Sequence, residues 1–193
     1  MRVAMILRPD ADRVFGGDTV VMERLGAALQ ALGADVVVGR QDEMPPAREF
    51  DLAHLFGVTP PDHARHMVTW ARQGRAAIVF SPLYYNDFRG WFSWATVRVP
   101  RWARMARLLG RERTWQVFRS WHTARQPLQS SWRTMRATLL AADAIATTSR
   151  WENDYLARHF RLPAKARSQM GLSRFGVDTS LYGRRFSEEE LAA

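Results

Sequence analysis

The chain of 193 residues contains no cysteine. Disulfide bonds, thiolate zinc sites and cysteine nucleophiles are therefore excluded. Long hydrophobic runs are also missing, because the first one, Val3 to Leu7, ends at Arg8 and is too short for a signal peptide. No later run approaches the roughly 18 apolar residues that a membrane-spanning helix needs. We therefore expect a soluble, cytoplasmic protein.

Acidic residues are nearly absent from one segment of the chain. Residues 88–136 contain eleven arginines and a single acid, Glu112, and so carry a net charge of +10, whereas the whole chain carries +9. The same segment holds six of the eight tryptophans. Arginine and tryptophan at this density indicate a surface that contacts an anionic and partly apolar partner. The rest of the chain is close to neutral.

Short apolar runs alternate with segments of helical periodicity, which is typical of α/β proteins. We predict strands at 3–7, 35–38, 51–56, 76–80 and 143–148, with a sixth within 168–175. Helices are predicted at 19–32, 60–73 and 150–160, and several more within 88–136. Continuous apolar runs, in place of strict alternation, predict a parallel sheet that is covered on both faces. The expected fold class is a Rossmann-like, doubly wound sheet with a Trp/Arg-rich helical insertion after the fourth strand.

Ligands of such sheets bind at the carboxyl ends of the strands. After the first strand, Gly16 and Gly17 precede Asp18, which we expect to cap a helix that starts at Thr19. Backbone N–H groups at this helix start would favour a phosphate, although two loop glycines can equally serve the turn alone. The chain lacks both G-x-G-x-x-G and G-K-[ST], so the loop fits neither a dinucleotide-binding turn nor a P-loop.

Other candidate ligand-binding residues follow or end later strands, and each also has a purely structural interpretation. They are His54, Ser81, Tyr84, Ser149 and Asp178. A histidine in an apolar strand is commonly a satisfied core residue, and Ser149 with Glu152 three residues later fits a capping box. His63 and His66 follow Asp62 on a helix, but no third ligand is evident, so we assign no metal.

The basic segment contains a candidate membrane-contacting surface. Helical spacing places four arginines on one side of a helix and an apolar set that includes Trp102 on the other. The predicted membrane-contact residues are Trp91, Trp94, Arg101, Trp102, Arg104, Arg107 and Arg111. A basic amphipathic helix with tryptophan is typical of membrane interfaces, whereas the alternative is an ordinary surface helix whose apolar face packs on the sheet. Single-stranded nucleic acid is a less favoured partner, because no recognition module matches.

Four stretches of the sequence, in this order, resemble the N-terminal domain of a GT-B glycosyltransferase of the family 4 type, in a bacterial polysaccharide-associated subgroup. They are GGDTVVMERLGAALQALGADVVV, DLAHLFGVTPPDHARHMVTWARQGRAAIVFSPLYYN, AADAIATTSRWENDYLARHF and SRFGVDTSLYGRRF. The last stretch is similar to the signature P-N-G-V-D-x-x-x-F, with Phe175 in place of the usual Asn. The resemblance implies that residues 1–186 form the acceptor-side domain, with 88–136 as its insertion, and that 187–193 begin a linker to a second domain.

The implied reaction is the transfer of a sugar from a nucleotide-sugar to an acceptor hydroxyl, with retention at the anomeric carbon. The donor is a co-substrate, and no cofactor or metal is implied. On this resemblance Gly16 to Thr19 border the cleft, His54, Ser81 and Tyr84 shape the acceptor side with Ser149 nearby, and Asp178 marks the approach to the hinge. The basic segment would hold the enzyme on the inner membrane leaflet beside a lipid-linked acceptor, and this fragment is expected to be inactive alone. The alternatives are a non-catalytic module that binds anionic membrane or nucleic acid, and a nucleotide-dependent oxidoreductase, which the missing glycine fingerprint disfavours.

Overall fold

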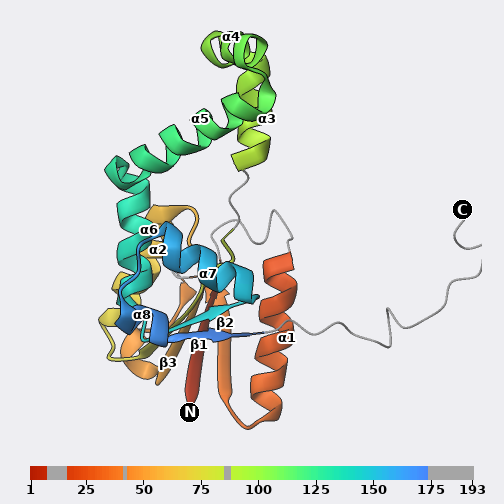
Figure 1. The fold of residues 1–193 in the computed structure, drawn as a ribbon. Helices are drawn as coiled ribbons and strands as arrows, with labels where there is room; N and C mark the ends of the chain where they lie inside the picture. Colours follow the sequence, from red (N-terminus) through yellow and green to blue (C-terminus); the bar gives the residue numbers. More distant parts are fainter. Residues whose placement is uncertain (8–16, 41–42, 85–87, 174–193) are drawn as a thin grey trace, which may run out of the picture.

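The computed structural model describes residues 1–7, 17–40, 43–84 and 88–173, which form an α/β fold around one parallel sheet (Figure 1). Six strands pair in the order β2-β1-β3-β4-β5-β6, and every pairing is parallel. The strands are β1 Arg2–Leu7, β2 Asp35–Arg40, β3 Leu52–Phe56, β4 Ala77–Ser81, β5 Ala144–Thr147 and β6 Met170–Leu172. The predicted parallel α/β sheet of Rossmann-like type is confirmed. The chain reverses direction across the sheet between β1 and β3, which makes this position the topological switch point.

Helices connect the strands close to the predicted positions. They are α1 Gly17–Ala31, α2 Pro61–Arg72, α3 Phe88–Arg98, α4 Pro100–Leu109, α5 Arg111–Arg125, α6 Ser130–Ala141, α7 Arg150–His159 and α8 Ala164–Ser168, with short 3₁₀ turns η2 Ala47–Glu49 and η3 Gln126–Leu128. Gly33 has φ 86° just after α1, as expected for a glycine that ends a helix. The predicted cap at Asp18 is wrong, because α1 already begins at Gly17 and Asp18 lies inside its first turn.

Two separate hydrophobic clusters cover the two faces of the sheet. Helix α1 packs Met22 on one face against Met5 and Phe56. Helices α2, α6, α7 and α8 pack on the other face, around a larger cluster that includes Phe80 and Leu156. Figure 1 shows α1 on one side of the sheet and α2, α6 and α7 on the other. Because side chains alternate along a strand, His54 lies on the same face as Phe56, the face that α1 covers.

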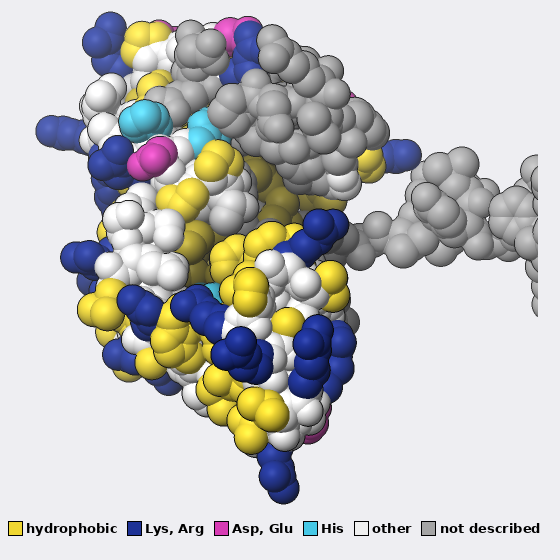
Figure 2. Space-filling model, turned by 90° about the horizontal axis from the view of Figure 1, so that it is seen from above, with side chains coloured by type: hydrophobic (Ala, Val, Ile, Leu, Met, Phe, Trp, Pro, Cys, Tyr) yellow, Lys and Arg dark blue, Asp and Glu magenta, His cyan; other side chains and the backbone are white. Residues whose placement is uncertain are grey.

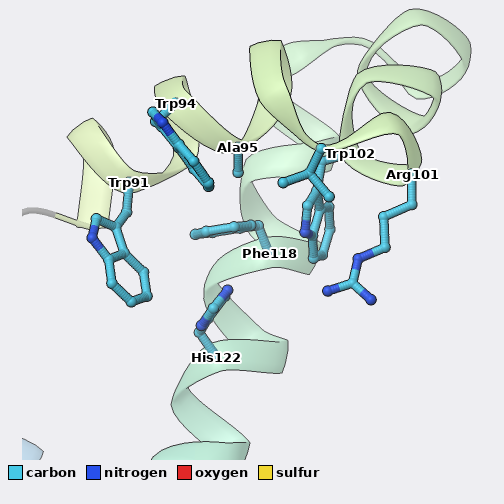
Figure 3. A pocket seen from close by; sticks show the side chains of 8 residues that line it. Trp91, Trp94, Ala95, Arg101, Trp102, Phe118 and His122 are labelled. Atoms are coloured by element: carbon cyan, nitrogen blue, oxygen red, sulfur yellow. The ribbon is translucent and has the colours of Figure 1, made fainter.

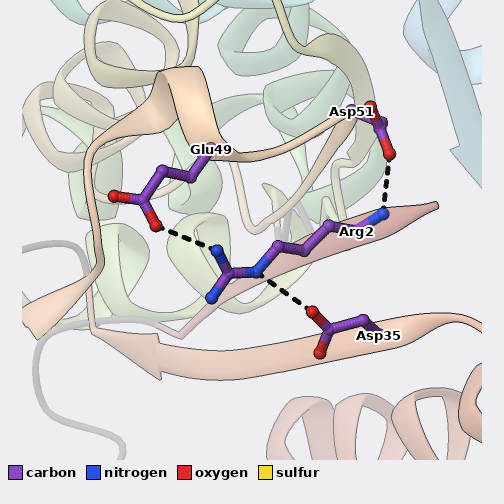
Figure 4. Close-up of polar contacts among 4 residues, drawn as sticks. All are labelled: Arg2, Asp35, Glu49 and Asp51. Atoms are coloured by element: carbon purple, nitrogen blue, oxygen red, sulfur yellow. Dashed lines mark hydrogen bonds and ion pairs between the residues drawn. The ribbon is translucent and has the colours of Figure 1, made fainter.

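A polar network joins the amino ends of the first strands (Figure 4). The Arg2 guanidinium lies 3.1 Å from the Asp35 carboxylate at the start of β2 and 2.9 Å from that of Glu49. The backbone N–H of Arg2 donates to Asp51 Oδ2 at 2.7 Å. These contacts join β1, β2 and β3 at their amino ends. The candidate site residues lie at the opposite edge of the sheet, where the strands end.

Helices α3, α4 and α5 form an extension, residues 88–125, which we call the arm. The arm rises from the edge of the sheet at which the strands end (Figure 1). It has a hydrophobic cluster of its own, formed by Phe92, Ala95, Trp102, Trp115 and Phe118. No helix in the described part of the chain is both long and apolar enough to cross a membrane.

One predicted helix face is broken in the arm. Helix α4 ends at Gly110, whose φ of 79° and ψ of 157° are open mainly to glycine. Arg111 therefore begins α5 and does not share a face with Arg101, Arg104 and Arg107, which corrects the sequence prediction. Its guanidinium instead donates to Ser93 Oγ on α3 at 2.8 Å.

Candidate functional site at the carboxyl edge of the sheet

The carboxyl ends of β3 and β4 bring together two predicted site residues, His54 and Ser81. Parallel pairing sets Phe56 opposite Ser81, so that the histidine two residues earlier on β3 reaches the serine diagonally. His54 Nε2 lies 2.8 Å from Ser81 Oγ, and both side chains are buried, at 7% and 3% exposure. The His54 ring also stacks on Phe56, with ring centroids 4.2 Å apart. This hydrogen-bonded pair lies on β3 and β4, and β3 directly borders the switch point.

Burial lowers the pKa of His54 to about 4, because the charged imidazolium would lose its hydration. The ring is therefore neutral at neutral pH, with one nitrogen that donates and one that accepts. A weakly basic imidazole beside a buried hydroxyl is a poor proton acceptor for a nucleophile. Neutral donors and acceptors of this kind suit hydrogen bonds to uncharged hydroxyl groups.

The start of α1 supplies the other side of the switch point. Gly17 is exposed and begins the helix, and Thr19 is buried at 8% exposure. Among the described residues, Thr19 Oγ1 has no hydrogen-bond partner, which is unusual for a buried hydroxyl. Gly16 and the side chain of Asp18 lie outside what the structure describes, as does Asp178 near the chain end. The helix start thus presents N–H groups that have no acceptor within the helix itself, and one hydroxyl that has no partner among the described residues.

Tyr84 and Ser149 are joined through Glu152, a buried carboxylate on α7. Ser149 Oγ accepts a hydrogen bond from the Glu152 backbone N–H at 3.1 Å, so the predicted N-cap is present. Glu152 Oε1 accepts from the Tyr84 N–H at 3.1 Å. Glu152 Oε2 accepts from the N–H and hydroxyl of Thr148 at 2.7 and 2.8 Å. The carboxylate therefore ties the end of β4 to the end of β5.

An aromatic group continues from Tyr84 along α7. The Tyr84 hydroxyl lies 3.3 Å from His159 Nε2, and the Tyr155 hydroxyl lies 3.3 Å from His159 Nδ1. Burial lowers the pKa of His159 to about 4, so this ring is also neutral near neutral pH. Trp132 Nε1 donates to the His159 carbonyl oxygen at 3.3 Å. The His159 ring is thus held between two hydroxyl groups.

Two cavities lie beyond this group, toward the arm. The first, which we call the junction cavity, has a volume of about 150 Å³ and is walled by both polar and aromatic side chains. Its lining residues are Tyr84, Phe88, Trp91, His122, Gln126, Gln129, Trp132, Met135 and His159. The second, the arm cavity, has a volume of about 480 Å³ and an almost wholly apolar lining (Figure 3). It is lined by Trp91, Trp94, Ala95, Val99, Arg101, Trp102, Phe118 and His122.

The outer surface of the arm is basic and partly apolar. All nine of its arginines are exposed, and the one acid in residues 88–125 is Glu112. The large apolar side chains exposed there are Trp91, Trp94, Val97, Leu108, Leu109 and Val117. Figure 2, which looks down on the arm, shows arginine and hydrophobic side chains interleaved over it. Trp102 is only 6% exposed, so it belongs to the interior of the arm and not to this surface.

Sequence reasoning missed three of the site's residues, Glu152 as a bridge, His159 and His122. Glu152 could be recognised as the acidic residue of a capping box, three positions after Ser149, but its hydrogen bond to Tyr84 depends on the tertiary fold. His159 and His122 lie in helix segments without a distinctive local pattern.

Within the described residues, no group of three His, Cys, Asp or Glu side chains is arranged to hold a metal ion. Asp62 instead pairs with Arg65 at 3.4 Å.

No protein-family model matches this chain. A search of curated proteins likewise finds no significant match.

Proposed function

We propose that this chain is the acceptor-side domain of a retaining glycosyltransferase, with the helices between β4 and β5 as its insertion. The observation that carries the proposal is the buried, neutral His54–Ser81 pair at the carboxyl ends of β3 and β4. Uncharged imidazole and hydroxyl groups beside a topological switch point suit a hydroxyl-rich ligand. One of the sequence stretches that resemble a family 4 glycosyltransferase contains both residues, which supports the proposal.

In the proposed reaction an acceptor hydroxyl forms a bond to the anomeric carbon of a nucleotide-sugar, and the bond from that carbon to the diphosphate breaks. The proton of the acceptor hydroxyl passes to an oxygen of the departing diphosphate, and the nucleoside diphosphate leaves. Gly17 and Thr19 at the start of α1 would donate hydrogen bonds toward the donor or the sugar. His54, Ser81 and Tyr84 would orient the acceptor, while Glu152 holds the loop that carries Tyr84.

The test uses the natural gene product that contains this chain, at its full length, and incubates it with labelled nucleotide-sugars and a bacterial lipid extract. We expect transfer of label to lipid and release of nucleoside diphosphate. The His54→Ala variant should lower the rate at least about tenfold, because the acceptor loses a positioning contact. Label transfer that is equally fast without His54, or no transfer from any nucleotide-sugar, would contradict the proposal.

A second candidate function is a non-catalytic module that binds an anionic membrane, and the arm is the observation that favours it. Exposed Trp91 and Trp94 next to nine exposed arginines match a peripheral membrane contact. The same contact would serve the proposed enzyme by holding it beside a lipid-linked acceptor on the inner leaflet.

Flotation with vesicles of anionic and of zwitterionic lipid tests this contact. We expect binding to anionic vesicles, weakened by salt, because arginine charges are screened. Oligonucleotide binding that is sensitive to salt, in the absence of vesicle binding, would instead favour nucleic acid as the partner.

A further inference from the structure

The junction cavity and the arm cavity are neighbours, because two side chains belong to the walls of both. Trp91 on α3 and His122 on α5 line each cavity, and their ring centroids lie 5.8 Å apart. Figure 3 shows Trp91 and Arg101 at opposite ends of the arm cavity, with Phe118 and His122 between them. The apolar arm cavity, or apolar chamber, and the more polar junction cavity, or polar chamber, thus share one boundary.

The two chambers differ in what they can bind. The arm cavity presents mainly indole and phenyl surface, and its volume of about 480 Å³ lies in the range of small-molecule sites. The junction cavity presents uncharged hydrogen-bonding groups from Gln126, Gln129, Tyr84 and His159. It lies next to the Glu152-linked loops at the sheet edge, where Tyr84 takes part in both.

Positive charge lies close to this boundary. The guanidiniums of Arg101 and Arg125 lie 5.3 and 4.7 Å from the centroid of the Trp121 ring, which contacts His122. The pKa of His122 is lowered by partial burial and by the positive charges of Arg101 and Arg125. No acidic side chain is among the described residues that line either cavity. An anion placed at this boundary would be attracted by both arginines, and no carboxylate in those walls would oppose it.

We propose that the two cavities form a single site for a phospholipid-like acceptor. Its apolar chain lies in the arm cavity, its phosphate lies at the boundary formed by Trp91 and His122, and its hydroxyl-bearing head group lies in the junction cavity. This inference rests on the proposed function, because only a glycosyltransferase would use the bound lipid as an acceptor. It adds the class of molecule that would receive the sugar. The head group would face the carboxyl edge of the sheet, where transfer is proposed.

Equilibrium binding to the full chain tests the site with three probes, all below their micelle-forming concentrations. They are a short-chain lysophosphatidylinositol, the lysophosphatidylcholine of the same chain length, and inositol 1-phosphate. The first contains the chain, the phosphate and the inositol hydroxyls. The second lacks the inositol hydroxyls and the net charge, and the third lacks the chain. We expect the first to bind at least about tenfold more tightly than either of the others, since each methylene buried contributes about fourfold and a charged hydrogen bond about tenfold.

Three variants assign the parts of the site. Trp94→Ala, in the apolar chamber, should weaken both lysolipids, whereas Gln129→Ala, in the polar chamber, should weaken lysophosphatidylinositol alone. Val97→Ala is the matched control, because Val97 is 75% exposed on the arm and lines neither cavity. Equal binding of the two lysolipids, or an equal loss from Val97→Ala, would overturn the proposal.

A measurement on the unmodified chain does not depend on how the variants fold. Bound phosphate should raise the pKa of His122 in an NMR titration, because it offsets the charges of Arg101 and Arg125. Lysophosphatidylcholine should raise this pKa less. If the His122 pKa is unchanged at saturating lysophosphatidylinositol, the proposed site is contradicted. Because none of these readings requires sugar transfer, loss of the site and failure of the transferase proposal remain distinguishable.

Discussion

His54 makes the stability of the protein depend on pH. Its pKa is about 4 in the folded chain against an ordinary value of 6.5, so between those pH values the unfolded chain binds a proton that the folded chain does not. The contribution of His54 to stability is therefore complete above pH 6.5 and is lost as the pH drops toward 4, by about 3 kcal/mol in total. His159 acts in the same direction.

The His54→Gln variant should flatten this acid limb, because glutamine carries no titrating group. Urea unfolding at about pH 7, 6 and 5 measures it. We expect the free energy of unfolding of the wild type to fall more steeply over this range than that of the variant. Parallel slopes in the two proteins would show that His54 is not the titrating residue.

Glu152 and Ser149 offer a comparison at neighbouring positions. Removing the carboxylate in Glu152→Ala leaves the N–H groups of Tyr84 and Thr148 without their acceptor, so we expect a loss of about 2–4 kcal/mol in unfolding free energy. Ser149→Ala removes one capping hydrogen bond and should cost about 1 kcal/mol. Thermal or urea unfolding distinguishes the two, and equal losses would mean that the bridge between β4 and β5 adds nothing to the cap.

At the scale of elements, the turn between α2 and β4 depends on Gly74. A methyl group at this position would overlap the backbone of Ala47 and Arg48, so Gly74→Ala forces the turn away from η2. We expect a loss of about 2 kcal/mol or more in unfolding free energy. Gly171→Ala is the control, because an added methyl group there meets no atom within 4 Å. A Gly74→Ala variant as stable as the control would contradict the close approach.

The strands could be predicted from the sequence, but the contacts between them could not. Apolar runs such as Val3–Leu7 identify buried parallel strands by themselves. The His54–Ser81 bond depends on the register of β3 against β4, which no local pattern sets. The sequence prediction puts Arg111 on the α4 face because its spacing continues that of the α4 arginines, whereas the helix ends before Gly110. Gly110 was the sequence signal for the end of α4, but the regular spacing of the arginines favoured a continuous helix.

At the scale of the whole molecule, charge and apolar surface are concentrated on the arm, so membrane binding should depend on tryptophans there and not elsewhere. The double variant Trp91→Ala/Trp94→Ala should reduce the fraction of protein that floats with anionic vesicles by about tenfold or more. Trp151→Ala is the matched control, since Trp151 on α7 is 64% exposed but lies outside the arm. If both variants lose binding equally, the arm is not the contact.

The separate hydrophobic cluster of the arm has a consequence for how the molecule opens. Phe92, Trp102 and Phe118 pack with one another and belong to neither cluster of the sheet. We therefore expect the arm to open as a cooperative unit of its own, losing its packing while the sheet remains folded. Native-state hydrogen exchange should divide the amides into two classes with different opening free energies. A protein built in this way can rearrange the part that we propose to contact a bilayer while the sheet stays folded.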